Sequence, residues 1–145
     1  MKNKNVFIVD SDPSSANKLR LHLEALHFDV TYFSTGSEMM NHLVSNPSLI
    51  ILSHDLDENN TGLDYLRLIK TINRTIPVLF VLSKQNLDMA VHALRLGAAS
   101  YVEKFNTSFE SIKNVLYDLD IEKKRRYASA LRTFRKGVFN LYGIY

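Results

Sequence analysis

Five short strand-like runs, each followed by polar residues and then by a helical pattern, constrain this chain more than any other feature. The runs fall at 6–9, 28–33, 49–52, 76–82 and 98–102 in a chain of 145 residues. Short apolar runs between turn signals are typical of strands covered on both faces, and their alternation with helices favours a parallel sheet. We therefore predict an α/β fold with a doubly wound five-stranded parallel sheet and a C-terminal helical extension.

Helix start and stop signals separate these runs. Asp12 precedes Pro13 as an N-cap should, and Thr35 and Thr61 are each followed by an acidic residue three positions later. Gly97 marks the end of a further helix. The inward-facing residues expected for the second and third helices are Met39, Met40, Leu43 and Val44, and Leu63, Leu66, Ile69 and Ile72.

Composition excludes several classes of protein. The chain has no cysteine, which rules out thiol catalysis and cysteine-ligated zinc. Its first apolar run ends at Asp10, too early for a signal peptide. No apolar stretch approaches the ~20 residues of a membrane span. We expect a cytoplasmic domain without a membrane span.

The basic residues gather near the end of the chain. Residues 121–137 contain seven Lys or Arg and one Glu, a net charge of +6, which leaves −3 for the rest of a chain whose net charge is +3. We assign residues 1–120 to the α/β domain and residues 121–145 to a basic helical extension or linker. Charge runs of this kind are more often solvated than bound to nucleic acid, so we expect no nucleic-acid partner.

Apolar residues within the extension have the spacing of a helix–helix seam. They recur at intervals of four, three, four and three residues, at Tyr127, Leu131, Phe134, Val138 and Leu141. A connector, a docking helix and a helix that forms a homodimer all fit this pattern.

Polar residues follow four of the predicted strands, where ligands bind in a doubly wound fold. Four segments together resemble the receiver domain of bacterial response regulators, the CheY-like domain, over residues 4–120. They are VFIVDSDPS, LIILSHDLDENNTGLDYL, IPVLFVLS and MAVHALRLGAASYVEKF. The resemblance implies a (βα)5 flavodoxin/CheY-like topology and a role in phosphorelay signal transduction.

The resemblance also implies a site that accepts a phosphoryl group. In this family an aspartate at the end of the third strand is phosphorylated, an acidic pair after the first strand holds Mg²⁺, and a Ser/Thr and a Lys bind phosphoryl oxygens. Asp10 matches the first acid, Ser83 the hydroxyl and Lys104 the ammonium, while Tyr101 resembles the aromatic residue that switches with phosphorylation. Phosphoryl transfer depends on such charge neutralisation and positioning.

Two positions depart from the pattern of the family. Ser11 stands where the second acid is expected, which weakens a Mg²⁺ site. The phosphate-accepting position falls on Ser53, or on His54 when counted back from Gly62, and Asp55 is the nearest aspartate. We interpret the chain as a degenerate receiver, or pseudo-receiver, with no catalytic residue and at most a weak Mg²⁺ site.

Other interpretations stay open. Asp55 is a candidate phosphate acceptor in an active receiver with Mg²⁺, or else belongs to a solvated acidic loop. Asp10 is a metal ligand, or else forms a structural ion pair with Lys104. The opening hhhhDxDx[ST] also fits haloacid-dehalogenase-like phosphatases, with Asp10 as nucleophile and Asp12 as acid/base, but no acidic pair follows a strand after Lys104. We expect no enzyme, but a module that binds signalling proteins through its last helix and fifth strand.

Overall fold

The computed structural model describes residues 4–83, 86–104 and 108–141, with the backbone alone at 121–123, 126 and 135–141. The strands are β1 (Asn5–Val9), β2 (Asp29–Phe33), β3 (Leu49–Ser53), β4 (Val78–Leu82) and β5 (Ser100–Glu103). The helices are α1 (Pro13–Ala25), α2 (Gly36–Asn41), the 3₁₀ turn η1 (Leu43–Ser45), α3 (Gly62–Ile72), α4 (Leu87–Arg95) and α5 (Phe109–Leu141).

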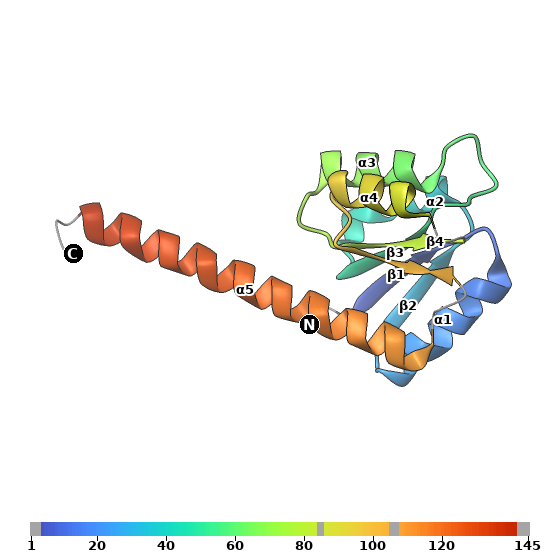
Figure 1. The fold of residues 1–145 in the computed structure, drawn as a ribbon, viewed down its shortest axis with the longest axis horizontal. Coiled ribbons are helices and arrows are strands. Elements are labelled where there is room, and N and C mark those ends of the chain that lie inside the picture. The colour runs from blue at the N-terminus through green and yellow to red at the C-terminus, as the bar shows by residue number, and fades with distance from the viewer. Residues whose placement is uncertain (1–3, 84–85, 105–107, 142–145) are drawn as a thin grey trace. The chain divides into compact units, whose positions relative to one another are not determined.

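The strands form one parallel sheet in the order β2-β1-β3-β4-β5. Helix α1 covers one face, and α2, α3 and α4 cover the other (Figure 1). The chain moves from β1 outward to β2 and then returns past β1 to β3. In such a sheet this reversal opens a crevice beyond the carboxyl ends of β1 and β3. The predicted doubly wound five-stranded sheet is confirmed.

Both faces of the sheet are buried. Phe7, Leu52 and Phe80 belong to one core cluster, together with Leu66 of α3. Successive side chains of a strand point to opposite faces, so neighbours such as Ile8, which is also buried, face the α1 side. Burial on both faces explains why the strands read as continuous apolar runs.

The helix starts lie where the sequence predicted them. The carboxylate of Asp12 accepts a hydrogen bond from the Ser14 N–H at 3.0 Å, and Pro13 is the first residue of α1. At α3 the caps are reciprocal, because the Thr61 N–H donates to Oδ2 of Asp64 at 2.8 Å and the Thr61 hydroxyl accepts from the Asp64 N–H. These bonds satisfy N–H groups that a helix leaves unpaired.

Two predicted core residues are instead exposed. Val44 is 92% exposed because α2 ends at Asn41 and the chain continues as η1, whose three-residue turn breaks the helical spacing. Ile72 is exposed because it is the last residue of α3, although at 100° per residue it points within about 20° of the buried Tyr65. Tyr65 takes the inward position in α3.

The chain divides into two compact units, Met1–Ile112 and Lys113–Tyr145. The first contains the sheet and helices α1 to α4, and the second contains the larger part of α5. The predicted boundary at 120/121 lies inside α5, which is helical without interruption over its whole length. Among the residues that the structure describes, no helix is both long and apolar enough to cross a membrane.

Candidate functional site

The carboxyl ends of the strands bring together residues that are far apart in the sequence. Asp10 directly follows β1, and Lys104 directly follows β5. In the sheet β3 and β4 lie between these two strands, with Val9 paired to Leu52 and Ser53 paired to Val81. One step beyond Val9, Asp10 therefore lies beside the end of β3.

An ion pair joins the first and the fifth strand ends. The Nζ of Lys104 lies 3.3 Å from Oδ1 of Asp10, and Asp10 is only 2% exposed. The same oxygen accepts a hydrogen bond from the Asp12 N–H at 3.0 Å, and the Tyr32 hydroxyl donates to the Asp10 carbonyl at 2.6 Å. Burial raises the pKa of Asp10, although the Asp12 N–H and the Lys104 ammonium act to lower it.

The space beside this ion pair is small and carries positive charge. A cavity of about 20 Å³ is lined by Asp10, Ser15, Lys18, Leu19, Val81 and Lys104. That volume holds about one water molecule. Two lysines and one aspartate thus line this cavity. Nowhere in the described part of the chain do three His, Asp or Glu side chains gather in a way that could hold a metal ion.

Ser53 occupies the strand position beside Asp10. It is the last residue of β3, is 3% exposed, and its hydroxyl donates to the Asp55 carbonyl at 3.4 Å. Since Ser53 and Ile51 are two residues apart on one strand, both side chains face the α1 side of the sheet, as the Asp10 cavity does. The residue next to Asp10 therefore supplies a hydroxyl and no carboxylate.

His54, the other candidate position, points its ring into a different environment. Its backbone N–H continues the ladder by donating to the Val81 carbonyl at 2.9 Å. Its ring lies 5.9 Å from that of Phe80, and its buried Nδ1 has no hydrogen-bond partner among the residues that the structure describes. The loop after His54 closes on Gly62, whose N–H donates to the His54 carbonyl at 3.0 Å. A side chain at Gly62 would collide with the backbone of Ser53.

Asp55 takes part in this loop through its backbone. Its carbonyl accepts from the Ser11 hydroxyl at 3.3 Å and from the Ser53 hydroxyl. The residue is exposed, and in the described ranges its carboxylate has no hydrogen bond or ion pair. The structure therefore brings together only two of the three charged groups that the sequence singled out. Asp10 and Lys104 form an ion pair, and the Asp55 carboxylate takes no part in it.

Comparison with known proteins decides the family. Residues 6–116 match the family model described as the response regulator receiver domain. The chain belongs to this family. It is a receiver domain of two-component signal transduction.

Relatives of this receiver are longer regulatory proteins. It is 24% identical to Nodulation protein W of Bradyrhizobium diazoefficiens over 92% of the chain and 59% of that protein. It is 28% identical to Response regulator protein GraR of Staphylococcus saprophyticus over 83% of the chain and 56% of that protein. The receiver thus spans less than two thirds of the length of these relatives.

Solved structures share the fold of this receiver. A CheY-like receiver domain from Methanospirillum hungatei superposes with a TM-score of 0.73 at 21% identity, over 85% of this chain and 98% of that one. NtrX from Brucella abortus superposes with a TM-score of 0.81 at 22% identity, over 89% of this chain and 29% of that one. The predicted CheY-like topology is confirmed.

The two remaining candidate residues lie on or after β4 and β5. Ser83 follows β4 directly and is half-buried, while Leu82, the last residue of that strand, fills the core. Since Leu82 pairs with Glu103, Ser83 lies one step further, level with Lys104. Tyr101 lies on β5 opposite Phe80 and is exposed.

Three residues in and around the site could not be predicted from the sequence. Lys18 and Ser15 line the Asp10 cavity from α1, and no local pattern distinguishes them from other helical polar residues. Glu58 fixes the loop between β3 and α3, since its carboxylate accepts from the Gly36 N–H at 2.9 Å and from the Tyr65 hydroxyl at 2.7 Å. In the sequence, Glu58 is distinguished only as an acidic residue in a polar loop, which does not predict these two hydrogen bonds.

Proposed function

We propose that this receiver works without aspartyl phosphorylation, as a protein–protein interaction module in cytoplasmic signal transduction. One observation carries the proposal: the end of β3 offers Ser53 and His54 where a receiver accepts its phosphoryl group. A hydroxyl or imidazole in that place does not form the acyl phosphate of an aspartate. The pseudo-receiver interpretation of the sequence rests on the same two residues.

The charge balance beside Asp10 supports the proposal. Mg²⁺ prefers several oxygen ligands and retains part of its water shell. The cavity beside Asp10 is lined by this one carboxylate and by two lysines, Lys18 and Lys104, and has about 20 Å³ of space. The nearby Asp12 carboxylate caps α1. These residues do not fit a tightly bound divalent cation. The Lys104 ammonium neutralises Asp10 without any phosphate.

The same contacts argue for a non-enzymatic role. A phosphatase of the haloacid-dehalogenase type would need Asp10 as nucleophile and Asp12 as acid/base. Asp12 uses one carboxylate oxygen to cap α1 through the Ser14 N–H at 3.0 Å and the other to accept from the Ser15 hydroxyl at 3.0 Å. Both carboxylates thus have structural partners, and we propose that neither acts on a substrate.

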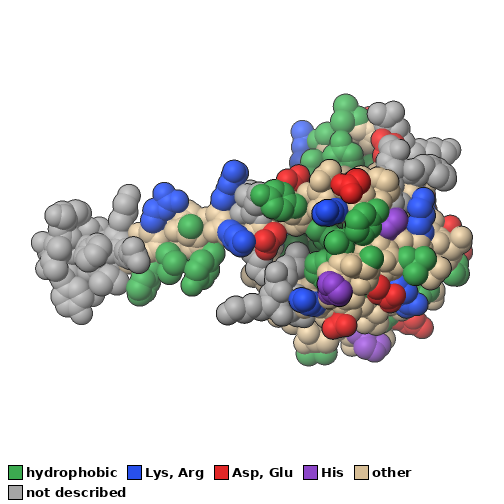
Figure 2. All heavy atoms as spheres, turned by 90° about the horizontal axis from the view of Figure 1, so that it is seen from below, with side chains coloured by type: hydrophobic (Ala, Val, Ile, Leu, Met, Phe, Trp, Pro, Cys, Tyr) green, Lys and Arg blue, Asp and Glu red, His purple; other side chains and the backbone are tan. Residues whose placement is uncertain are grey.

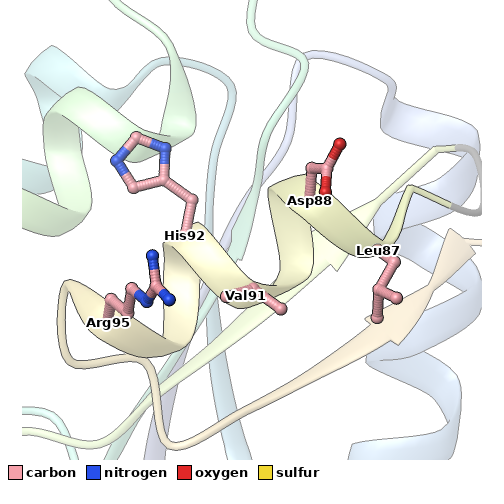
Figure 3. Close-up of a pocket in the computed structure, with 5 residues that line it drawn as sticks. All are labelled: Leu87, Asp88, Val91, His92 and Arg95. Atoms are coloured by element: carbon pink, nitrogen blue, oxygen red, sulfur yellow. The ribbon is translucent and has the colours of Figure 1, made fainter.

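We propose that the protein partner binds a partly apolar surface on α4 and β5. Leu87, Val91 and Leu94 of α4 and Tyr101 of β5 are large side chains left exposed. A surface hollow of about 510 Å³ lies along α4, and Figure 3 shows Leu87 and Val91 on one side of this helix, with polar residues on the other. An apolar centre with a polar edge suits a signalling protein.

The test is a direct search for phosphorylation. The purified chain is treated with acetyl phosphate and MgCl₂ and its intact mass is measured, while beryllofluoride with Mg²⁺ is added to a second sample and amide NMR spectra are recorded. We expect no gain of about 80 Da and no shifted amides near β3. An authentic phosphorylated receiver treated in parallel shows that the reagents are active.

The Asp55→Asn variant separates the proposal from its main alternative. If the wild-type chain gains a phosphoryl group and Asp55→Asn does not, the chain is an active receiver that uses the shifted aspartate, and the proposal is wrong. Asp57→Asn, which changes the neighbouring exposed acid, is the matched control for loss of charge in the same loop.

A further inference from the structure

An apolar stripe runs along the second unit of the chain. Tyr127 and Phe134 of α5 are 68% and 69% exposed, and Leu131 between them is 40% exposed. In Figure 2 apolar side chains lie along one edge of this helix and Lys and Arg side chains along the opposite edge. The stripe leaves large apolar side chains in water along α5, so a covering surface is expected.

The spacing of the stripe is that of a coiled coil. Alternating steps of three and four residues connect Tyr117, Asp120, Lys124, Tyr127, Leu131, Phe134, Val138 and Leu141. This register extends over more than three heptads and places Leu131 at position a and Phe134 at position d. The flanking residues Ala128 and Ala130 are small. The apolar face is therefore a narrow seam, whereas a helix that lies on a membrane surface needs a broad one.

We propose that residues 117–141 form a parallel two-stranded coiled coil with a second copy of this chain. In proteins most helical stability comes from the packing of an apolar face, and the apolar face of this segment is exposed at Tyr127 and Phe134. Two copies bring identical seams together, so each apolar layer faces its own equivalent. The proposal is independent of whether the receiver is phosphorylated.

Two charged residues in the seam select the parallel orientation. The Nζ of Lys124 lies 3.3 Å from Oδ2 of Asp120 one turn away. In a parallel pair Lys124 shares a layer with Lys124 of the other copy, and Asp120 shares the adjacent layer with its own equivalent. Because the two layers are adjacent, each ammonium has a carboxylate of either copy within reach, which an aspartate in an apolar layer would not have. In an antiparallel pair over 117–141, Lys124 would face Phe134 and Asp120 would face Val138. Charges would then be buried against apolar residues at a cost in free energy.

The charges beside the seam are compatible with the same orientation. In a parallel coiled coil, position g of one helix lies near position e of the following heptad in the other helix. By sequence these pairs are Lys123 with Ala128, and Ala130 with Arg135. No pair combines two basic residues. Basic residues such as Arg125 and Arg132 fall on the outer positions, where the two helices are far apart.

The first experiment measures the mass of the full chain by sedimentation equilibrium. We expect a mass of twice the 16.6 kDa of the chain for wild type. Leu131→Asp places two like charges in one apolar layer and should yield the monomer mass. Ser129→Asp, which adds the same charge on the outer face, should leave the dimer intact. A monomeric wild type, or a dimer that survives Leu131→Asp, would overturn the proposal.

The second experiment tests the orientation and does not depend on the folding of a seam variant. The chain has no cysteine, so Lys124→Cys introduces a single thiol at a seam position. Under oxidised glutathione we expect a covalent dimer for Lys124→Cys and a much slower reaction for Arg125→Cys on the outer face. Equal rates would overturn the parallel seam. Sedimentation of a monomeric chain with vesicles of anionic phosphatidylglycerol would assign the stripe to a membrane surface instead and overturn the proposal.

Discussion

Lys104 places its Nζ 3.3 Å from Oδ1 of Asp10, although 94 residues separate the two in the chain. Because β3 and β4 lie between β1 and β5, this ion pair crosses the carboxyl ends of both inner strands. It neutralises the acid that follows β1 and lies where a receiver otherwise holds its phosphoryl group. The ion pair therefore bears on the stability of the domain, whereas the inactivity that we propose rests on Ser53 and His54 at the end of β3.

Removal of the Lys104 ammonium should destabilise the domain. Lys104→Met keeps much of the side-chain volume but leaves Asp10 buried without its partner. Breaking a buried ion pair from one side costs about 3 kcal/mol, so we expect a loss of that size in the free energy of unfolding, measured by urea titration at neutral pH.

Two further variants are controls for the Lys104→Met measurement. Asp10→Asn combined with Lys104→Met removes both charges and should recover part of the loss. Lys113→Met, at an exposed position of α5, should change stability by less than about 0.5 kcal/mol. A Lys104→Met variant as stable as Lys113→Met would show that the ion pair contributes nothing.

The pH dependence of stability should carry the signature of Asp10. Burial raises the pKa of Asp10 above its ordinary value of 3.8, so the folded chain binds this proton more tightly than the unfolded chain does. The contribution of Asp10 to stability is therefore complete below pH 3.8 and is lost as pH rises through the folded-state pKa. Relative to Asp10→Asn, the wild-type chain should lose stability over that interval.

Carboxyl ¹³C NMR gives the direct measurement, as a titration of each aspartate in the folded chain. Asp64 is an internal control with the opposite sign, because the Thr61 N–H lowers the pKa of its carboxyl. An Asp10 resonance that titrates below 3.8 would contradict the prediction. In Lys104→Met the Asp10 pKa should rise further, since one of the groups that lower it is absent.

Glu58 should hold the loop between β3 and α3. Its carboxylate accepts hydrogen bonds from the Gly36 N–H and the Tyr65 hydroxyl, so Glu58→Ala leaves both donors without this partner. We expect a loss of roughly 1–3 kcal/mol in the free energy of unfolding, measured by urea titration. Asp57→Ala, at an exposed neighbour, should be close to neutral, and equal effects of the two variants would refute a specific role for Glu58.

Much of the site could be predicted because parallel strands end at one edge of a sheet. Apolar runs located β1 and β5, and this alone predicted that the residues after them, Asp10 and Lys104, would share that edge. The structure adds their separation of 3.3 Å. The ring position of His54 could not be predicted, since it depends on Phe80 of the neighbouring strand.

The errors in the fold have equally local causes. Val44 has the helical spacing of a core residue, but α2 is only six residues long. Asn46 adopts a left-handed conformation with φ 56° directly after η1, so the chain turns before another helical turn can form. Periodicity alone does not reveal where a helix changes to a 3₁₀ turn.

Restoring carboxylates should give the domain a response to phosphoryl analogues. Ser11→Asp combined with Ser53→Asp places one acid next to Asp10 in the chain and another at the end of β3 beside Asp10, and Lys104 remains. Position 53 faces the α1 side of the sheet, where the Asp10 cavity lies, whereas the His54 ring lies against Phe80. An aspartate at 53 therefore points toward Asp10, and one at 54 points to the other face. We expect beryllofluoride with Mg²⁺ to shift amide resonances around β3 in the double variant but not in wild type. Ser11→Asp combined with His54→Asp is the matched control and should respond weakly or not at all, because position 54 faces away from Asp10. If neither variant responds while both remain folded, the missing carboxylates are not what silences the site, and the barrier lies in residues such as Lys18 that line its cavity.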